Sequence, residues 1–406
     1  MTAAPFLPYG RQSIDDDDIA AVAAALRSDW LTTGPAVEKF EASLAAAVDA
    51  PHAVVCNSGT AALHLAALAI GLGPGDVVLV PSITFMASAN AARYVGADVE
   101  FVDVDPATGL SQPHHFEAAF ARARKGRVRA AIPVHYAGQC ADPEGLAKIA
   151  AARDFTVIED ACHALGTRYG VGNEMNFVGS ARHSAMCAFS FHPVKTIAMG
   201  EGGAITTRDG ALAERLRRYR SHGIERRAEN FEDRAAALAA DGSVNPWYHE
   251  LPDPGFNYRA SDINCALATS QLAKLARYAA ERRRLGEMYG RLLAPLAPVI
   301  RPLARVSACD PVWHLYVARI DFPALGMDRA AAMAALKKAG IGTQVHYIPV
   351  HRQPYYRRLY GQVELPGADA FYESCLTLPL FVGMDDGDVE RVVAALAGLV
   401  RQAGRD

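Results

Sequence analysis

The stretch VRAAIPVHYAGQCADPEGLAKIAAARDFTVIEDA, residues 128–161, carries the clearest signal of the fold. It predicts a strand over 128–135, a helix over 143–154 and a second strand over 155–161. Both strands are apolar with little alternation, which is typical of strands that are buried on two faces. Strand–helix–strand order of this kind predicts a parallel sheet covered by helices.

The same alternation extends toward the N-terminus. Strands are expected over 76–81 and 99–105, with a helix over 86–96 between them and another helix just before residue 128. Open α/β sheets bind ligands at the carboxyl ends of their strands. Polar residues stand at several of these ends, namely Ser82, Asp103, His135 and Asp160. We therefore expect an α/β fold with its site at this edge of a mostly parallel sheet.

The last third of the chain has a different pattern. Residues 225–246 are charged and alanine-rich and predict a surface excursion. The segment 261–296 predicts one long amphipathic helix. A further strand is expected over 313–320, and residues 343–351 are expected to form a strand that runs into a loop. Further helices are expected over 329–341 and 385–400. The predicted division is a large α/β domain with an N-terminal arm, 1–260, and a smaller α+β domain, 261–406.

Composition narrows the class of protein. The 406 residues are 51% hydrophobic with a net charge of −3, and no basic stripe suggests a nucleic-acid partner. The seven cysteines are scattered without a CxxC pair, which favours reduced thiols over disulfides or a metal site. We recognise no signal peptide and no apolar run that would span a membrane. The sequence therefore predicts a cytoplasmic enzyme without a metal.

The segment VVCNSGTAALHLAALAIG, residues 54–71, predicts a strand, a tight turn and a helix. Gly59 permits close approach of the backbone, and Ser58 and Thr60 add hydroxyls to a helix N-terminus that can bind an anion. An ordinary helix cap is the alternative, because serine and threonine are common at any helix start.

Two acids close the strand in VIEDACHALG, residues 157–166. A carboxylate at this point, Glu159 or Asp160, could pair with a protonated heterocycle, as in enzymes that use pyridoxal 5′-phosphate (PLP). His163 could lie over the same ligand. A structural salt bridge is the alternative.

Lys195 lies in FSFHPVKTIAMGEGG, residues 189–203, among apolar residues. Desolvation lowers the pKa of an ammonium group below its ordinary value of about 10.4 and frees the amine for covalent chemistry. Ser190 can donate to a phosphate, and the glycines after Lys195 allow a sharp turn. A lysine that extends from a strand end into solvent is the alternative. The interpretation of Lys195 as a reactive lysine is favoured by four features that follow one another along one α/β domain. They are the turn at 58–60, Phe85, Asp160 and Lys195, and together they describe a PLP site.

These motifs, with NSGTAALHLA, VPSITFMASANA, IEDACHALG and GFNYRASDINCAL, resemble the DegT/DnrJ/StrS family of sugar aminotransferases. The resemblance runs from about residue 8 to 400 and implies the fold-type I architecture of PLP-dependent transferases. It implies that Lys195 binds PLP covalently and shuttles the proton, and that Asp160 holds the pyridine nitrogen. The remaining implied PLP contacts are Ser58, Gly59, Thr60, Phe85, His163 and Ser190, together with Asn257 from the other subunit of a homodimer. Family members with histidine in place of the lysine dehydrate sugars, so Lys195 favours transamination.

A finer resemblance concerns the family members that make pseudaminic acid precursors. It rests on FSFHPVK, NPWYHE, TQVHYIPVHRQPYYR and LTLPLF. It implies transfer of an amino group from L-glutamate to C4 of a UDP-linked 4-keto-6-deoxy-N-acetylhexosamine. Residues 168–184 and 225–246 depart from the expected pattern near the rim of the site, which leaves the sugar open.

Residues expected to contact this large substrate come from two segments. They are Tyr9, Asp29, Trp30, Leu31 and Thr32 on the N-terminal arm, and Gln344, Val345, His346 and Tyr347 on a loop of the smaller domain. His351 is a further candidate for a substrate contact. For both His346 and His351 the alternative is a purely structural role. Arg259 and the arginines within 217–227 are candidates for the diphosphate.

Two other functions stay open at this point. One is another sugar nucleotide 4-aminotransferase, of the UDP-4-amino-4-deoxy-L-arabinose, bacillosamine or GDP-perosamine type. The other is a sensor that keeps the fold without turnover, against which the intact Lys195, Asp160 and Ser190 argue.

Overall fold

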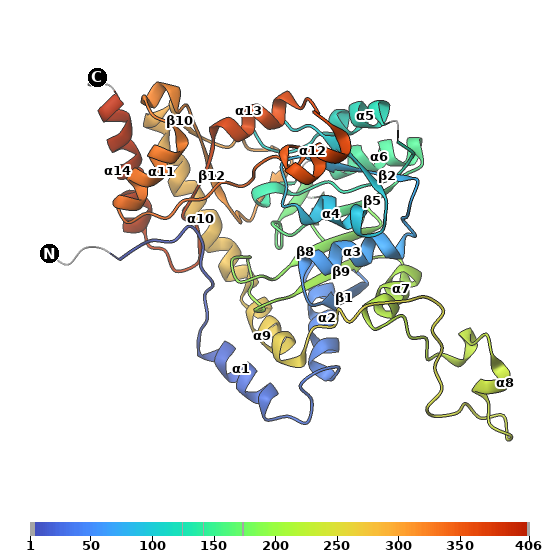
Figure 1. Ribbon diagram of the computed structural model, residues 1–406. Coiled ribbons are helices and arrows are strands. Elements are labelled where there is room, and N and C mark those ends of the chain that lie inside the picture. The colour runs from blue at the N-terminus through green and yellow to red at the C-terminus, as the bar shows by residue number, and fades with distance from the viewer. Residues whose placement is uncertain (1–4, 124, 141, 173, 404–406) are drawn as a thin grey trace.

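A seven-stranded sheet forms the centre of the larger part of the molecule (Figure 1). The structure, a computed structural model, describes residues 5–123, 125–140, 142–172 and 174–403. The strand order is β1-β9-β8-β5-β4-β2-β3. The strands are β1 (His52–Cys56), β2 (Asp76–Pro81), β3 (Asp98–Val102), β4 (Arg127–Ala131), β5 (Thr156–Asp160), β8 (Met186–Ser190) and β9 (Gly203–Thr207).

The predicted mostly parallel sheet is confirmed. Only β9 runs antiparallel to its two neighbours, β1 and β8, and the remaining neighbours pair in parallel. β8 and β9 are consecutive strands joined by residues 191–202, so the segment with Lys195 is the connection between them. It leaves the sheet at the end of β8, near the end of β5 that carries Asp160.

Helices cover both faces of this sheet. One face packs against α3 (Gly59–Ala69), α4 (Ala87–Tyr94) and α7 (Gly210–Arg220). The opposite face packs against α5 (Pro113–Arg122) and α6 (Pro143–Arg153) on one half, and α2 (Pro35–Ala47) and α9 (Asp262–Ala273) on the other. Successive residues of a strand alternate between the faces. Val78 and Val80 of β2 accordingly lie in the core with α3, and Val77 and Leu79 in the core with α5.

The quoted stretch folds as predicted, with β4, α6 and β5 in order. Asp142 caps α6 by accepting from the Gly145 amide at 2.8 Å, and Pro143 occupies the first turn. The helix ends at Asp154, which adopts a left-handed conformation with φ of 55°. Local capping therefore reinforces the strand–helix–strand pattern.

A smaller part of the chain forms a second core. The sheet β10-β12-β13 consists of β10 (Ile300–Pro302), β12 (Tyr316–Ile320) and β13 (Cys375–Leu378). It packs with α10 (Leu275–Leu293), α11 (Arg329–Lys338) and α14 (Asp386–Ala403), and Leu7 of the N-terminal arm joins the same core. A third sheet pairs β11 (Cys309–Asp310) with the hairpin of β6 (Arg168–Val171) and β7 (Glu174–Phe177). The division at residues 260/261 stays a prediction.

Three short segments complete the fold. α12 (Pro354–Tyr360) and α13 (Pro366–Ser374) return to the large core, where Tyr356 packs edge-on to Phe101 with ring centroids 5.2 Å apart.

α8 (Arg234–Ala237) lies in the excursion at 225–246, which projects from the body in Figure 1. No helix among the described residues has both the length and the apolar character needed to cross a membrane.

The N-terminal arm links the two parts. It runs past the smaller core, where Leu7 bridges to Ile341, and continues into α1 (Asp16–Leu26), which packs against α9 (Figure 1). The arm therefore touches both cores before the chain enters the large sheet.

Two predictions of secondary structure were wrong. Residues 261–296 form two helices, α9 and α10, which meet at Lys274. The side chain of Lys274 turns toward Asp15 and Asp18 of the arm, a contact that the local sequence does not show. The strand expected at the start of 343–351 is only an isolated bridge from Gln344 to Thr377. The loop after it leads to a short 3₁₀ turn, and in this loop the carbonyl of His346 accepts from the Tyr136 hydroxyl.

Candidate active site

The N-terminus of α3 forms a close-packed turn at the edge of the sheet. Ser58 caps the helix, and its hydroxyl accepts from the Ala61 amide at 3.0 Å. A Cβ at Gly59 would lie 2.7 Å from Cβ of Ser190, and one at Gly203 would lie 2.3 Å from the carbonyl of Ser58. Both positions therefore need glycine. The structure brings the predicted residues Ser58, Gly59 and Ser190 together, and Thr60 follows in the first turn of the helix.

Asp160 ends β5 with its carboxylate held from two sides. Ser88 of α4 donates to Oδ2 at 2.6 Å, and the Cys162 amide donates to Oδ1 at 3.1 Å. The hydroxyl of Ser88 is also 3.2 Å from the carbonyl of Phe85. Ser88 therefore links Asp160 to Phe85, whose ring is 52% exposed and free to contact a ligand.

Glu159 faces the other side of the sheet. Its Oε2 lies 2.6 Å from His135 Nε2, and both side chains are buried. Burial alone would raise the pKa of the Glu159 carboxyl, but the hydrogen bond and charge of His135 outweigh it and lower this pKa below its ordinary value of 4.5. Of the two acids, Glu159 is the structural one and Asp160 remains for a ligand.

The other polar residues at strand ends are structural as well. Ser82 bonds to Nδ1 of His351 at 2.6 Å, which satisfies that histidine within the protein. Asp103 accepts from the amides of Gly367 and Ala368 at 2.9 and 2.7 Å and so holds the start of α13. Of the four polar residues expected at these strand ends, Asp160 is therefore the one that remains to contact a ligand.

Lys195 lies in the connection from β8 to β9, and its amide donates to the carbonyl of His192 at 2.8 Å. Burial lowers the pKa of its amine, although Cys162 and Asp160 nearby act in the opposite direction. A lowered pKa increases the fraction of neutral amine, which is the form that attacks a carbonyl group.

His163 is a neutral donor. The Ala137 amide donates to its Nδ1 at 3.3 Å, so the ring proton lies on Nε2. Burial, with the charge of Lys195 and the proximity of His346, lowers the pKa of this imidazole well below its ordinary range. Nε2 lies 3.0 Å from the Tyr347 hydroxyl and donates to it, which leaves the hydroxyl hydrogen of Tyr347 to donate to a ligand.

Three of the predicted substrate residues meet near this point. The ring of Tyr9 lies 5.4 Å from that of His346, and Tyr347 lies 6.1 Å from Phe85. Nδ1 of His346 bonds to the Thr377 hydroxyl at 2.8 Å, and burial lowers the pKa of His346 to about 4. His346 is therefore neutral at physiological pH.

The other predicted substrate residues lie elsewhere in the single chain. Gln344 is exposed and pairs through its backbone with Thr377, and Val345 lines a separate surface groove with Arg319 and Tyr372. Asp29, Trp30, Leu31 and Thr32 are exposed. Their segment is held by the amide of Asp262, which donates to the carbonyl of Leu31 at 3.0 Å.

Asn257 is also exposed and bridges to Ser221. The next residue, Tyr258, accepts from the Asn57 amide at 2.8 Å beside the turn, but no contact among the described residues joins the Asn257 side chain to Ser58, Gly59 or Thr60. Its role, like those of the exposed arm residues, stays a prediction that requires a second chain.

The structure adds residues that the sequence did not single out. Ser88 holds Asp160, His314 packs against His163 with ring centroids 4.4 Å apart, and the ring of Tyr136 lies 6.2 Å from that of His163. Tyr136 directly follows a predicted strand end, which was a usable signal. Nothing local marks Ser88 or His314, because their roles depend on distant partners.

Comparisons with known proteins agree along nearly the whole chain. The DegT/DnrJ/EryC1/StrS aminotransferase family matches residues 12–397. The spore coat polysaccharide biosynthesis protein SpsC of Bacillus subtilis is 37% identical over 401 residues, 98% of each chain. Helicobacter pylori PseC, an aminotransferase involved in the biosynthesis of pseudoaminic acid, superposes with a TM-score of 0.86 at 25% identity, over 98% of this chain and 100% of PseC. Spr1654 of Streptococcus pneumoniae in its PLP form gives 0.84 at 26% identity, over 98% and 99%.

Proposed function

Because the chain belongs to the DegT/DnrJ/EryC1/StrS family of PLP-dependent sugar aminotransferases, we propose a specific reaction for it. The amino donor is L-glutamate, and the acceptor is C4 of UDP-2-acetamido-2,6-dideoxy-β-L-arabino-hex-4-ulose. This is the reaction of UDP-4-amino-4,6-dideoxy-N-acetyl-β-L-altrosamine transaminase, in pseudaminic acid biosynthesis. The similarity to PseC and the segments NPWYHE and TQVHYIPVHRQPYYR support this substrate.

The residues at the sheet edge fit PLP. Ser58, Gly59, Thr60 and Ser190 would hold its phosphate, since the glycine leaves room where a Cβ would collide with Ser190. Asp160 would accept from the protonated ring nitrogen, and Phe85 and His163 would cover the ring. When bound, PLP supplies a carbonyl that bonds amines covalently and a ring that withdraws electrons.

Lys195 would supply the amine and the proton transfer. Its Nζ would hold the cofactor at rest, take the proton from Cα of glutamate, and return a proton to C4 of the sugar. The burial that lowers its pKa suits it to both roles. Asp160, fixed by Ser88, would keep the ring nitrogen protonated while these steps occur.

Tyr9, His346 and Tyr347 would line the sugar side of the site. The Tyr347 hydroxyl, which accepts from His163, keeps a hydrogen to donate to a substrate oxygen. A groove of about 780 Å³ with Thr33, Arg217, Arg218, Arg226 and Arg259 among its lining residues lies in the part of the chain that holds Asn257. Its arginines suit the diphosphate.

The site would be completed by a homodimer. Asn257, Asp29, Trp30, Leu31 and Thr32 are exposed in one chain, which is compatible with contacts to a second chain's cofactor and substrate. Gln344 and Val345, on the loop that carries His346 and Tyr347, keep their predicted substrate role in this proposal. A cytoplasmic location is supported by the seven cysteines, which are all free thiols.

The observation that carries the proposal is the held Asp160 beside a half-buried Lys195, in a chain of this family. The first test is an absorbance spectrum of the purified protein before and after L-glutamate is added. A visible band that gives way to a shorter-wavelength band supports the cofactor, the lysine and the donor together. A spectrum without a band, even after soaking in PLP, refutes turnover and favours the sensor.

A second candidate is a related 4-aminotransferase with another nucleotide sugar. The 37% identity to SpsC supports this second candidate, because the name of SpsC assigns it to spore coat polysaccharide biosynthesis. Turnover of UDP- and GDP-linked 4-keto sugars, followed by mass spectrometry, decides between the two. A clear preference for a GDP sugar would contradict the pseudaminic acid assignment.

A further inference from the structure

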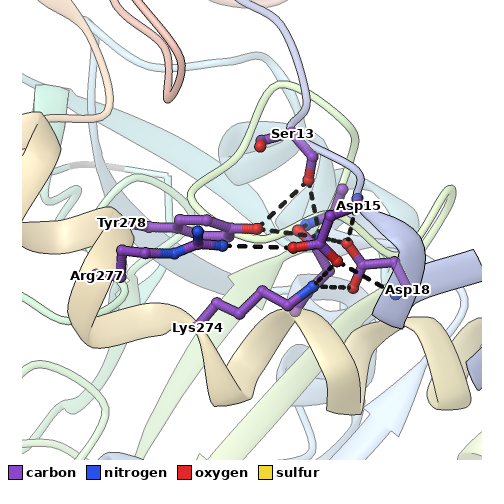
Figure 2. Close-up of polar contacts among 8 residues, drawn as sticks. Ser13, Asp15, Asp18, Lys274, Arg277 and Tyr278 are labelled. Atoms are coloured by element: carbon purple, nitrogen blue, oxygen red, sulfur yellow. Dashed lines mark hydrogen bonds and ion pairs between the residues drawn. The ribbon is translucent and has the colours of Figure 1, made fainter.

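A polar cluster joins the N-terminal arm to the junction of α9 and α10 (Figure 2). Asp15 and Asp18 cap the start of α1 reciprocally, each accepting from the other's amide. Lys274 pairs with both carboxylates, with its Nζ 2.9 Å from Oδ1 of Asp18. Arg277 lies on the outside of the cluster, 3.4 Å from Asp15. Two acids thus face two bases, and the fully buried Asp18 is compensated.

Gln271 connects this cluster to the interior. Its side chain is buried, and Nε2 donates to Asp18 Oδ2 at 2.6 Å and to the carbonyl of Ser13 at 2.9 Å. Its Oε1 accepts from the amide of Ala198 at 3.2 Å. A backbone amide can only donate, so the orientation of the Gln271 amide is determined. One side chain therefore reaches from the arm to the connection that carries Lys195, three residues before Ala198.

This connection has no helix or strand of its own between residues 191 and 202. Within it, the Met199 amide donates to the carbonyl of Phe191 at 2.9 Å. From α9, Asn264 donates to the carbonyl of Met199 at 2.6 Å, and Gln271 accepts from Ala198. Two amide side chains of one helix thus fix the segment that follows Lys195.

We propose that Gln271 is a positioning residue for Lys195, through which the arm cluster of Asp15, Asp18 and Lys274 stabilises the half-buried position of the lysine. The inference rests on the proposed role of Lys195. It goes beyond that role because it couples the arm to the lysine, and the same arm places Tyr9 against His346. Loss of this link would loosen the connection and admit water to the Lys195 amine.

The test is the rate at which apoenzyme captures PLP, followed by the visible band as a function of pH. The midpoint of this profile reports the pKa of the Lys195 ammonium. Gln271→Met keeps the length of the side chain but removes its donor and its acceptor. We expect the midpoint to rise by about one pH unit and kcat to fall about tenfold, because water stabilises the ammonium form. The groups that interact electrostatically with Lys195, namely Asp160, Cys162, His163, His314 and His346, are unchanged in this variant.

A second variant acts from the arm. Asp18→Ala removes the carboxylate acceptor for Gln271, whose amide keeps the carbonyl of Ser13, and leaves Asp15 as a partner for Lys274, so no buried cation is left unpaired. The proposal predicts a shift of the midpoint in the same direction. If Gln271→Met does not fold, this variant alone decides.

Two controls separate positioning from general stability. Tyr289→Phe removes a buried hydroxyl that donates to the carbonyl of Pro379 at 2.8 Å in the smaller core, remote from Lys195. Arg277→Ala removes the outer member of the cluster, whose side chain is 62% exposed. Both should leave the midpoint in place. A midpoint for Gln271→Met or Asp18→Ala within about 0.2 unit of the wild type would overturn the proposal. Absence of the visible band in the wild type would instead reject the proposed role of Lys195.

Discussion

Removal of the Ser88 hydroxyl tests how Asp160 is held. Ser88 is fully buried, Asp160 is 5% exposed, and their hydrogen bond is 2.6 Å long. After Ser88→Ala, Cys162 still donates to this carboxylate through its amide. A hydrogen bond to a charged group contributes about 1.5–3 kcal/mol, which corresponds to about 10- to 150-fold in an equilibrium constant.

The part of this free energy that orients Asp160 should be lost from cofactor binding. Water can enter the space of the missing hydroxyl and replace some of the interaction, so we expect the lower end of the range. The Kd for PLP should therefore increase about tenfold. The assay is a titration of apoenzyme with PLP, followed by absorbance, for the wild type and Ser88→Ala.

The matched control is Ser43→Ala. Ser43 is half-buried on α2, and its hydroxyl donates to the carbonyl of Lys39 at 2.8 Å within the helix. Its loss should leave the Kd for PLP unchanged. If Ser88→Ala binds PLP within twofold of the wild type while its melting temperature falls, Ser88 serves packing alone and Asp160 is held by other means.

Lys195→Ala should abolish transamination and the visible band of the lysine-bound cofactor while the melting temperature of the apoenzyme stays near that of the wild type; unchanged turnover would refute its role. Glu159→Gln should lower stability by about 1–3 kcal/mol, because His135 loses a buried charged partner, yet leave the cofactor spectrum unchanged. Because the pKa of Glu159 is lowered in the folded state, this carboxylate stabilises the protein at pH values above its ordinary pKa of 4.5. That stability is lost as the pH falls through the folded pKa. Glu159→Gln should therefore show a weaker acid destabilisation than the wild type in denaturant titrations below pH 5. Equal mixtures of Lys195→Ala and Asn257→Ala chains, unfolded and refolded together, should recover about a quarter of wild-type activity, since half of the dimers are mixed and one of their two sites is intact. No recovery from two separately inactive variants would contradict a shared site.

The alternation of strands and helices that builds the large sheet was predictable because its signals are local. Apolar runs, a proline at the first turn of α6 and the cap at Asp142 all lie within the segment that they organise. The choice between Glu159 and Asp160 was not local. Both faces of β5 are buried, so VIED shows no alternation to distinguish them. The family resemblance favoured Asp160, and the structure explains the choice by placing Glu159 against His135.

Other features could not be read because they join residues far apart in the chain. Lys274 is a good helix former, so nothing in its own segment predicts the break between α9 and α10. The break accompanies ion pairs of Lys274 to Asp15 and Asp18, more than 250 residues earlier. The contacts of Ser88 with Asp160 and of Gln271 with Ala198 likewise depend on how distant elements pack.

The predicted substrate residues divide in a way that has a physical explanation. Tyr9 and His346 meet in one chain because the arm bridges to the smaller core at Leu7 and Ile341. Trp30 and Leu31 are large apolar residues on the same arm, but they are 54% and 49% exposed, whereas Leu7 is buried. Apolar side chains at adjacent positions are stabilised by removal from water. A second chain that covers them would bury this surface and carry its own Asn257 toward the site, so assembly and completion of the active site would share one driving force.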